Sequence, residues 1–390
     1  MLKYIADPSL GSITIEDQLI LDLVKTKEFN RLSRILHLGT AHLLFPGATH
    51  NRFIHSLGVY ELARISLNHI QKNNSIPPKT YQAVLAAALL HDIGHGPLSH
   101  VFEKLSPINH EEQSIKIILS KETEVGKVFS KHPQIQKETA QIIEGKHPLT
   151  WANQLISSEI DVDRLDYLLR DSLLTGTNYG RIDWRWLIEN ITIVDNKLTF
   201  YEKGIQAVEA LILARYHMNQ VCYHNTKVEG YSELFVWIIN RFMQLHKENK
   251  LKGTYSDFIP ILEKKLLTVQ QFQKIDDDFI NNIFAEEKEI ENDPILNKLI
   301  DAYFNRRHPQ IIIDVKEIEQ IRKNYDPKLE NITWSIVKQP TNFPQYLADG
   351  LSEALIYTHN HEIIPIKKVS TIFNLKDKGE ASSKEIALIM

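Results

Sequence analysis

The chain has 390 residues, of which 43% are hydrophobic and 24% charged, as is typical of a globular protein. A formal net charge of −4 argues against nonspecific nucleic-acid binding, so nucleic acid is an unlikely partner. The single cysteine, Cys222, excludes an intrachain disulfide and a multi-cysteine zinc site, and it fits a reducing compartment. No stretch approaches the roughly 20 apolar residues of a membrane span, and the N-terminus lacks a signal-peptide pattern. We therefore expect a cytoplasmic protein without membrane contact.

Helices dominate the predicted elements as far as residue 245. A short strand or turn over residues 12–20 comes first, and apolar residues then recur at spacings of three and four. The predicted helices are 17–37, 54–72, 79–92, 110–122, 133–144, 150–172 and 205–245. Segment 191–200 is an exception, because apolar runs flank Asp195-Asn196 and predict a β-hairpin.

The pattern of residues changes beyond residue 248. A charged region over residues 255–305 is expected to be helical. Strands are predicted at 310–315, at 333–338 and, as a pair joined at His359-Asn360-His361, within 353–369. The tail, 374–390, is expected to be polar and then weakly helical. The sequence thus predicts a mainly α fold, with a helical domain over 1–248 and a small mixed α/β C-terminal appendage over 249–390 that could serve oligomerisation or regulation.

The strongest local signal is the segment LLHDIGHGPLSH, residues 89–100. An apolar helix runs directly into His91-Asp92, and Gly94 and Gly96 then let the backbone turn so that adjacent side chains can face one ligand. A buried histidine with an aspartate as capping partner is the alternative. We favour a metal site, because burying an aspartate behind an eight-residue apolar run is costly without a cation.

Two further segments supply candidate ligands. In RFIHSLGV, Arg52 and His55 lie three residues apart on one helical face, although a core histidine beside a surface arginine explains this segment equally well. In SEIDVDRLDYLLRD, Asp163, Tyr167 and Asp171 share a face. A solvated acidic face paired with arginines is the alternative there. A tyrosine between two aspartates nevertheless suits a pocket.

Two histidines and two aspartates together suit a divalent metal ion. Ligands of these types favour Mn, Fe, Mg or Zn over copper, without selecting among the four. Such an ion lowers the pKa of a water molecule and polarises a phosphorus–oxygen bond. His95, His100 and His110 are then left for proton transfer, and Glu103 or Glu111 could orient them.

These motifs resemble those of the HD superfamily of phosphohydrolases, and more narrowly the deoxynucleoside triphosphate (dNTP) triphosphohydrolases of the dGTPase and SAMHD type. The resemblance covers about residues 3–230 and rests on RFIHS, HDIGHGPLSH and IDVDRLDYLLRD. It implies an HD-domain helical core. The implied metal ligands are His55, His91, Asp92 and Asp163, and the implied catalytic residues are His95 and His100, with His110 and Glu103 nearby.

The same resemblance implies substrate contacts. They are Arg52 and Arg164 for the triphosphate, Tyr167 and Asp171 for base and sugar, and Arg215, Tyr223 and Lys227 within the later stretch 213–228. The register in that stretch is one residue short, which leaves open whether Cys222 or Tyr223 takes the tyrosine role. Lys227 is the candidate phosphate-binding lysine.

Two departures from the family pattern bear on specificity. Relatives carry Gln-Leu-Gly against the deoxyribose, whereas this chain has His37-Leu38-Gly39, so His37 and Leu38 are the expected sugar contacts. Nucleotide-activated relatives carry an acidic residue, a glutamine and an arginine in the first helix. Lys25, Asn30 and Ser33 stand there instead, so activation by GTP through the same contacts is not expected.

The resemblance implies hydrolysis at the α-phosphorus of a dNTP, giving a deoxynucleoside and triphosphate. A homo-oligomer, dimer or tetramer, is implied as well. Two alternatives stay open: a phosphohydrolase that acts on another nucleotide or phosphoester, and a nucleotide-binding regulatory module with a structural metal. Spare histidines such as His95 and His100 favour an enzyme, because a structural site needs no proton donors.

Overall fold

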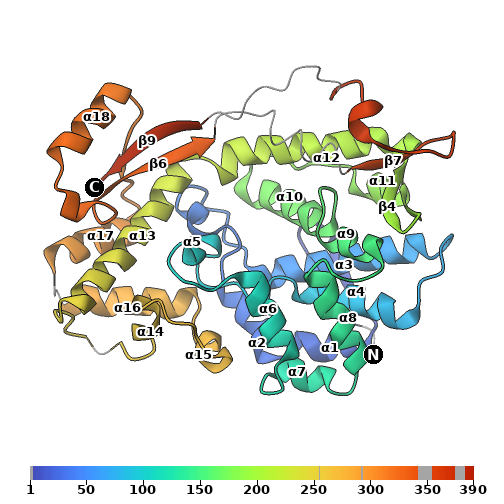
Figure 1. Ribbon diagram of the computed structural model, residues 1–390, viewed down its shortest axis with the longest axis horizontal. Helices are drawn as coiled ribbons and strands as arrows, with labels where there is room; N and C mark the ends of the chain where they lie inside the picture. The colour runs from blue at the N-terminus through green and yellow to red at the C-terminus, as the bar shows by residue number, and fades with distance from the viewer. Residues whose placement is uncertain (1–2, 254, 291–292, 341–353, 374–382) are drawn as a thin grey trace.

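The computed structural model describes residues 3–253, 255–290, 293–340, 354–373 and 383–390. It is 57% helical and 12% strand, which confirms the mainly α fold. Figure 1 shows the helices packed around one another, with short strands at two ends of the molecule. Within the described ranges, no helix combines the length and the apolar character needed to cross a membrane.

The N-terminal segment forms a hairpin and then several short helices. The hairpin pairs β1 (Lys3–Asp7) with β2 (Gly11–Ile15), and α1 (Gln18–Val24), α2 (Lys27–Arg31), η1 (Leu32–Arg34) and η2 (Gly39–Leu43) follow. The single helix predicted over 17–37 is therefore wrong. Thr26 interrupts it, because its hydroxyl donates to the Leu23 carbonyl and accepts from the Phe29 amide, which caps a new helix.

The central helices build the scaffold of the pocket. They are α3 (Arg52–Ile70), α4 (Pro78–Leu90), α5 (His100–Glu103), α6 (His110–Leu119), α7 (Glu124–Phe129), α8 (Pro133–Ile143), α9 (Thr150–Ile156) and α10 (Val162–Thr175). Helix α4 lies in the middle, and every residue from Ala83 to Leu90 is buried. The predicted helix 150–172 is two helices, because Asp161 caps α10 by accepting from the Arg164 amide.

The predicted hairpin near residues 191–200 is confirmed. Strands β3 (Ile191–Val194) and β4 (Lys197–Tyr201) pair through a two-residue turn, where Asp195 and Asn196 both have positive φ. Helix α11 (Trp184–Glu189) precedes it. Short β7 (Leu355–Tyr357) then adds to β4 in parallel, and β8 (Ile363–Pro365) completes the sheet β3-β4-β7-β8.

After that hairpin come two long helices and the C-terminal elements. They are η3 (Glu202–Gly204), α12 (Ile205–Met218), the π-turn η4 (Asn219–Tyr223), α13 (Thr226–Lys247), α14 (Ile259–Leu262), α15 (Val269–Gln273), α16 (Asp277–Ile290), α17 (Pro294–Phe304), β5 (Gln310–Ile312), α18 (Val315–Asn324), η5 (Pro327–Leu329), β6 (Trp334–Pro340), η6 (Ile366–Lys368) and β9 (Ser383–Ile389). A second sheet has the order β5-β9-β6 and lies beside α18 (Figure 1).

The expectation of a weakly helical tail is wrong for residues 383–390. Strand β9 there pairs along its length with β6, which buries Ile386 and Leu388. The rest of the predicted tail, 374–382, lies outside the described residues. The pairing of β9 with β6, which is distant in the sequence, determines the secondary structure of these residues. A local pattern of residues contains little information about such a partner.

The hydrophobic core continues across residue 248. Phe242 in α13 stacks on Phe284 in α16 at a centroid distance of 6.0 Å and meets Phe258 edge-on at 5.4 Å. All three rings are fully buried. The helices after residue 248 therefore pack directly on the framework that carries the site.

Candidate active site

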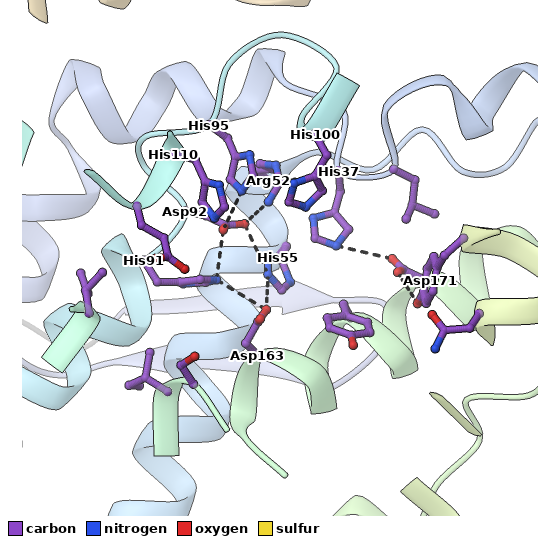
Figure 2. Close-up of a pocket in the computed structure, with 18 of the residues that line it drawn as sticks. His37, Arg52, His55, His91, Asp92, His95, His100, His110, Asp163 and Asp171 are labelled. Carbon is purple, nitrogen blue, oxygen red and sulfur yellow. Dashed lines mark hydrogen bonds and ion pairs between the residues drawn. The ribbon is translucent and has the colours of Figure 1, made fainter. Parts of the chain in front are cut away.

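Four side chains from three helices converge at one end of a cavity (Figure 2). His55 lies on α3, His91 and Asp92 directly follow the last residue of α4, and Asp163 lies in the first turn of α10. Asp163 Oδ1 is 3.0 Å from His55 Nε2 and 3.5 Å from His91 Nε2. The Asp92 carboxylate is 3.4 Å from His91 Nε2 and 3.6 Å from His55 Nε2. The expected ligands thus face one point.

The chemistry of this cluster fits a divalent cation. Among the described residues, the buried Nε2 atoms of His55 and His91 have no hydrogen-bond partner. Burial opposes protonation of His55, yet the carboxylates of Asp163 and Asp166 outweigh it and raise the pKa of His55 to about 10. A cation at this point would balance the same carboxylates in place of that proton and would use both Nε2 lone pairs.

Each histidine ligand is oriented through its other ring nitrogen. His91 Nδ1 lies 3.0 Å from the Ala88 carbonyl, one turn back in the same helix. His55 Nδ1 lies 2.8 Å from Asp166 Oδ2. A proton held at Nδ1 by these acceptors leaves Nε2 as the lone pair that points into the cluster.

A fully buried chain of charges stands behind His55. The Arg170 guanidinium makes two hydrogen bonds to Asp166, of 2.9 and 2.7 Å, and a third of 2.8 Å to Asp7 in β1. The sequence analysis did not single out Asp7, Asp166 or Arg170 as part of the site. The spacing of four residues between Asp166 and Arg170 was the available signal.

The turn after Asp92 depends on Gly94. A Cβ atom there would overlap the His110 carbonyl and the backbone nitrogen of Ser114. Glycine thus lets α6 approach the loop that follows α4, and this contact brings His110 over the cluster.

Three histidines and one glutamate cover the cluster. His95 stacks on His110 at a centroid distance of 4.0 Å, and Glu103 accepts hydrogen bonds from His110 and His100. Burial opposes ionisation of Glu103, but the hydrogen bonds from the two histidines outweigh it and hold the pKa of Glu103 below its usual range.

His95 differs electrostatically from its neighbours. Burial and then the Arg52 charge hold the pKa of His95 well below its usual value, so its imidazole is neutral. The His95 and His110 rings are only 17° from parallel. Their in-plane lone pairs therefore do not converge as metal ligands do, and the group suits proton transfer better than a second metal.

Hydrogen-bonding side chains gather at the opposite end of the cavity. Tyr223 donates to Asp171 Oδ2 at 2.8 Å, and His50 Nε2 lies 2.7 Å from Asp171 Oδ1. His37 lies between the two ends, with its ring 4.2 Å from that of His55 and its Nε2 3.8 Å from Asp171. The Tyr167 and Tyr223 rings meet edge-on.

The cavity has a volume of about 480 Å³. Its lining residues are His37, Leu38, Arg52, His55, His91, Asp92, His95, His100, His110, Glu111, Ile143, Ile156, Ser157, Asp163, Tyr167, Asp171, Asn219, Tyr223 and His224. Most of the residues singled out in the sequence are thus brought together. Glu103 is not a lining residue, but it forms hydrogen bonds with His100 and His110, which are.

Three expected substrate contacts lie elsewhere. Arg164 and Arg215 both pair with Glu159, and Lys227 is exposed in the first turn of α13. Arg52 does reach the cavity, where its guanidinium pairs with the metal-side carboxylate of Asp92.

The sequence analysis missed Asn219 and His224, which also line the cavity. The π-turn η4 over Asn219–Tyr223 separates α12 from α13, and such widened turns are frequent at functional sites. It points Tyr223 at Asp171 and leaves Cys222 buried. The four-residue spacing of Asn219 and Tyr223 was the signal for a shared face.

Fold and site together define a helical protein with a candidate metal centre in a cavity, and comparisons with known proteins identify its class. The HD domain model matches residues 52–171, and the HD associated region model matches residues 182–230. The chain belongs to the HD-domain phosphohydrolase superfamily, which confirms the resemblance seen in its sequence.

Individual relatives extend this picture. The chain is 38% identical to the uncharacterized protein YwfO of Bacillus subtilis over 309 residues, covering 78% of this chain and 70% of YwfO. It is 31% identical to the deoxynucleoside triphosphate triphosphohydrolase SAMHD1 homolog of Dictyostelium discoideum, covering 57% of this chain and 46% of that one. A phosphohydrolase crystal structure from Bacteroides thetaiotaomicron matches with a TM-score of 0.87 at 25% identity, over 100% of both chains.

Proposed function

We propose that this protein hydrolyses deoxynucleoside triphosphates to a deoxynucleoside and triphosphate. One observation carries the proposal: a single cavity joins a cluster of metal-ligand type to a group of hydroxyl-binding side chains. His55, His91 and Asp163 stand at one end, and Asp171 and Tyr223 at the other. The cavity volume of about 480 Å³ lies within the range of small-molecule sites.

Residues at the two ends of the cavity are proposed to have different roles. A divalent cation (Mn, Fe, Mg or Zn) held by the cluster would supply a water of lowered pKa and polarise phosphate oxygens. Asp171 and Tyr223 can bind sugar hydroxyls, and the Tyr167 ring offers an apolar face for the nucleoside. His100, held by Glu103 at 3.1 Å, stands ready to donate a proton to the leaving oxygen.

The likeness to the SAMHD1 homolog supports a nucleotide substrate. A second candidate is a phosphohydrolase of another nucleotide or phosphoester. Among the described residues that line the cavity, Arg52 is the sole arginine or lysine, and it pairs with Asp92. This single cationic side chain favours a substrate with fewer phosphate charges than a triphosphate. A triphosphate would be bound if Arg164 or Arg215 exchanged its ion pair with Glu159 for contacts to the substrate.

Product analysis decides between these functions. The full chain, supplemented separately with Mn, Fe, Mg and Zn, is incubated with dNTPs, NTPs, nucleoside monophosphates and cyclic dinucleotides. The proposal expects deoxynucleoside plus triphosphate from dNTPs. Formation of monophosphate and pyrophosphate from dNTPs would contradict the proposal and favour the second candidate. Hydrolysis of one of the other compounds without hydrolysis of dNTPs would do the same.

Variants separate an enzyme from a regulatory module. His55→Ala is expected to abolish turnover and metal binding together, while His69→Ala, on the same helix but outside the cavity, serves as the matched control. His100→Ala should keep the metal and lose turnover by roughly a hundredfold or more. A protein that binds nucleotide and metal but never turns over would be a regulatory module.

We further propose that the protein acts as a homo-oligomer, a dimer or tetramer, in the cytoplasm. The resemblance to the SAMHD-type group supports this assembly. Light scattering of the purified chain at several concentrations tests it, and a monomer at every concentration would contradict it.

A further inference from the structure

The loop between the metal-side histidines and His100 contains two residues in a rarely populated backbone conformation. Leu98 has φ of 50° and Ser99 has φ of 57°, and both are buried. Side chains other than glycine seldom adopt positive φ, and they persist there only when their surroundings hold them. The chain passes through this pair directly into His100.

A carboxylate from the C-terminal part of the chain holds this strained pair. Asp277, the first residue of α16, accepts a hydrogen bond of 2.7 Å from the Leu98 amide at Oδ1. Its Oδ2 accepts another, of 2.8 Å, from the Leu36 amide. Leu36 immediately precedes His37, so one side chain ties together two segments that line the cavity.

Ser99 extends the connection toward the metal cluster. Its hydroxyl donates to the Leu36 carbonyl at 2.9 Å and accepts from Arg52 Nε at 2.9 Å. Arg52 in turn pairs with Asp92. The backbone that Asp277 fixes therefore sets the place of a side chain in direct contact with a metal-side carboxylate.

A neighbouring contact anchors the other side of the same loop. The buried Arg31 donates from Nη1 to the His95 carbonyl and from Nε to the Ile275 carbonyl, both at 2.9 Å. Its guanidinium also lies 4.3 Å from the centre of the Phe272 ring. Residues 272–277 are thus held at the back of the loop that carries His95 and His100.

We propose that Asp277 is a positioning residue of the active site, which clamps the loop bearing His95 and His100 against the segment bearing His37. This inference rests on the proposed function, because it assigns Asp277 a part in the turnover at that site. Asp277 is not among the residues that line the cavity, and its carboxylate reaches the lining segments through the amides of Leu36 and Leu98.

The test compares Asp277→Asn and Asp277→Ala with Asp278→Asn in the full chain. Asn keeps the shape but turns an NH₂ group toward one of the two amides, so it loses one hydrogen bond, and Ala loses both. Asp278, the next residue of the same helix, is exposed and is the matched control. The measurements are kcat and KM for a dNTP, metal content per chain, and amide exchange at Leu36 and Leu98.

We expect kcat to fall by about tenfold or more in Asp277→Ala and less in Asp277→Asn, with KM within about threefold, since small displacements of catalytic groups act mainly on turnover. Metal content should be unchanged. Amide exchange should accelerate at both Leu36 and Leu98 in Asp277→Ala and at one of the two in Asp277→Asn. Asp278→Asn should match the wild type. If the Ala variant does not fold, the isosteric Asn variant decides.

Wild-type kcat in a folded Asp277→Asn variant, or a loss of kcat that only follows loss of metal, would overturn the clamp. A wild-type protein that turns over no nucleotide would instead defeat the proposed function. In that event, amide exchange still tests the clamp. Rates at both Leu36 and Leu98 that are equal in Asp277→Asn and Asp278→Asn would reject it.

Discussion

His55 contacts carboxylates on both sides of its imidazole, Asp163 within the metal cluster and Asp166 behind it. Partners behind a metal-bound histidine fix its tautomer and raise its strength as a ligand. We therefore expect Asp166→Asn to weaken metal affinity by about 10- to 100-fold, with a parallel loss of turnover that excess metal partly restores.

Metal titration followed by calorimetry measures this affinity, and circular dichroism verifies that the variant folds. Asp278→Asn is again a suitable control, because its side chain is exposed. Unchanged metal affinity in folded Asp166→Asn would show that Asp166 serves only its pair with Arg170.

Glu103 provides a pH-dependent prediction. Hydrogen bonds from His100 and His110 overcome the effect of burial and hold the pKa of Glu103 below the ordinary value of 4.5. A lowered folded-state pKa stabilises the fold at pH values above the unfolded-state pKa, and this contribution disappears as the pH falls through the folded-state pKa. Glu103→Gln should thus cost stability at about pH 6, and the difference from wild type should shrink below about pH 4.

Urea denaturation at several pH values tests this, with Glu122→Gln, at an exposed position beyond the C-terminal end of α6, as the control. A difference that grows on acidification would reverse the sign and contradict the argument. Turnover at neutral pH should fall in Glu103→Gln by about a hundredfold, because His100 loses the carboxylate that holds it.

At the scale of single residues, the sequence motifs singled out the four side chains that converge at one end of the cavity, namely His55, His91, Asp92 and Asp163. The sequence could not identify His50, because nothing local shows that this residue meets Asp171 from 121 positions away. It also could not show that Arg164 and Arg215 share Glu159. Such pairs depend on tertiary distances, which a helical spacing does not contain.

Helix α10 shows what periodicity can and cannot decide for an element. Asp163, Tyr167 and Asp171 line the cavity from one face, as their spacing predicted. Asp166 and Arg170 occupy the adjacent face, which is buried against α3 and β1. The spacing did not indicate what this face contacts, and the structure places a buried ion-pair chain there.

We predict that Arg170→Ala destabilises the protein by about 3–5 kcal/mol, because it leaves the buried carboxylates of Asp166 and Asp7 without their partner. Arg181→Ala, at an exposed position, should change stability by less than about 0.5 kcal/mol. Chemical denaturation of both variants provides the comparison. A small effect of Arg170→Ala would mean that water or protonation readily replaces the guanidinium.

The errors in predicted elements have two causes. Side-chain caps interrupt long apolar patterns, as Thr26 and Asp161 do, and a cap is difficult to distinguish from a polar residue inside a helix. The prediction of a helical tail was wrong for a different reason. Residues 383–389 pair with β6 over their whole length, and this partner precedes them by more than 40 residues.

For the whole molecule, composition and pattern predicted a mainly α protein with strands near its end, and this is what the structure shows. The sequence could not show where those C-terminal strands go. Strand β7 joins the hairpin of β3 and β4 on one side, while β9 joins β5 and β6 on the other (Figure 1). Long-range strand pairing of this kind is set by packing and not by local propensity.

The division predicted near residue 248 can be tested by truncation. A chain of residues 1–248 would lose Phe258 and Phe284, which cover Phe242, and would lose Asp277 and Ile275, which accept hydrogen bonds from the catalytic loop and from Arg31. Exposing the Phe242 ring and removing the Ile275 carbonyl from the buried Arg31 should cost a large part of the typical stability of about 5–15 kcal/mol. We therefore expect residues 1–248 to show no cooperative thermal transition and no metal-dependent stabilisation, measured by calorimetry with and without added Mn. The full chain is the control, and it should unfold at a higher temperature when the metal is present. A cooperative, metal-stabilised transition in the truncated chain would instead establish residues 1–248 as an independent domain.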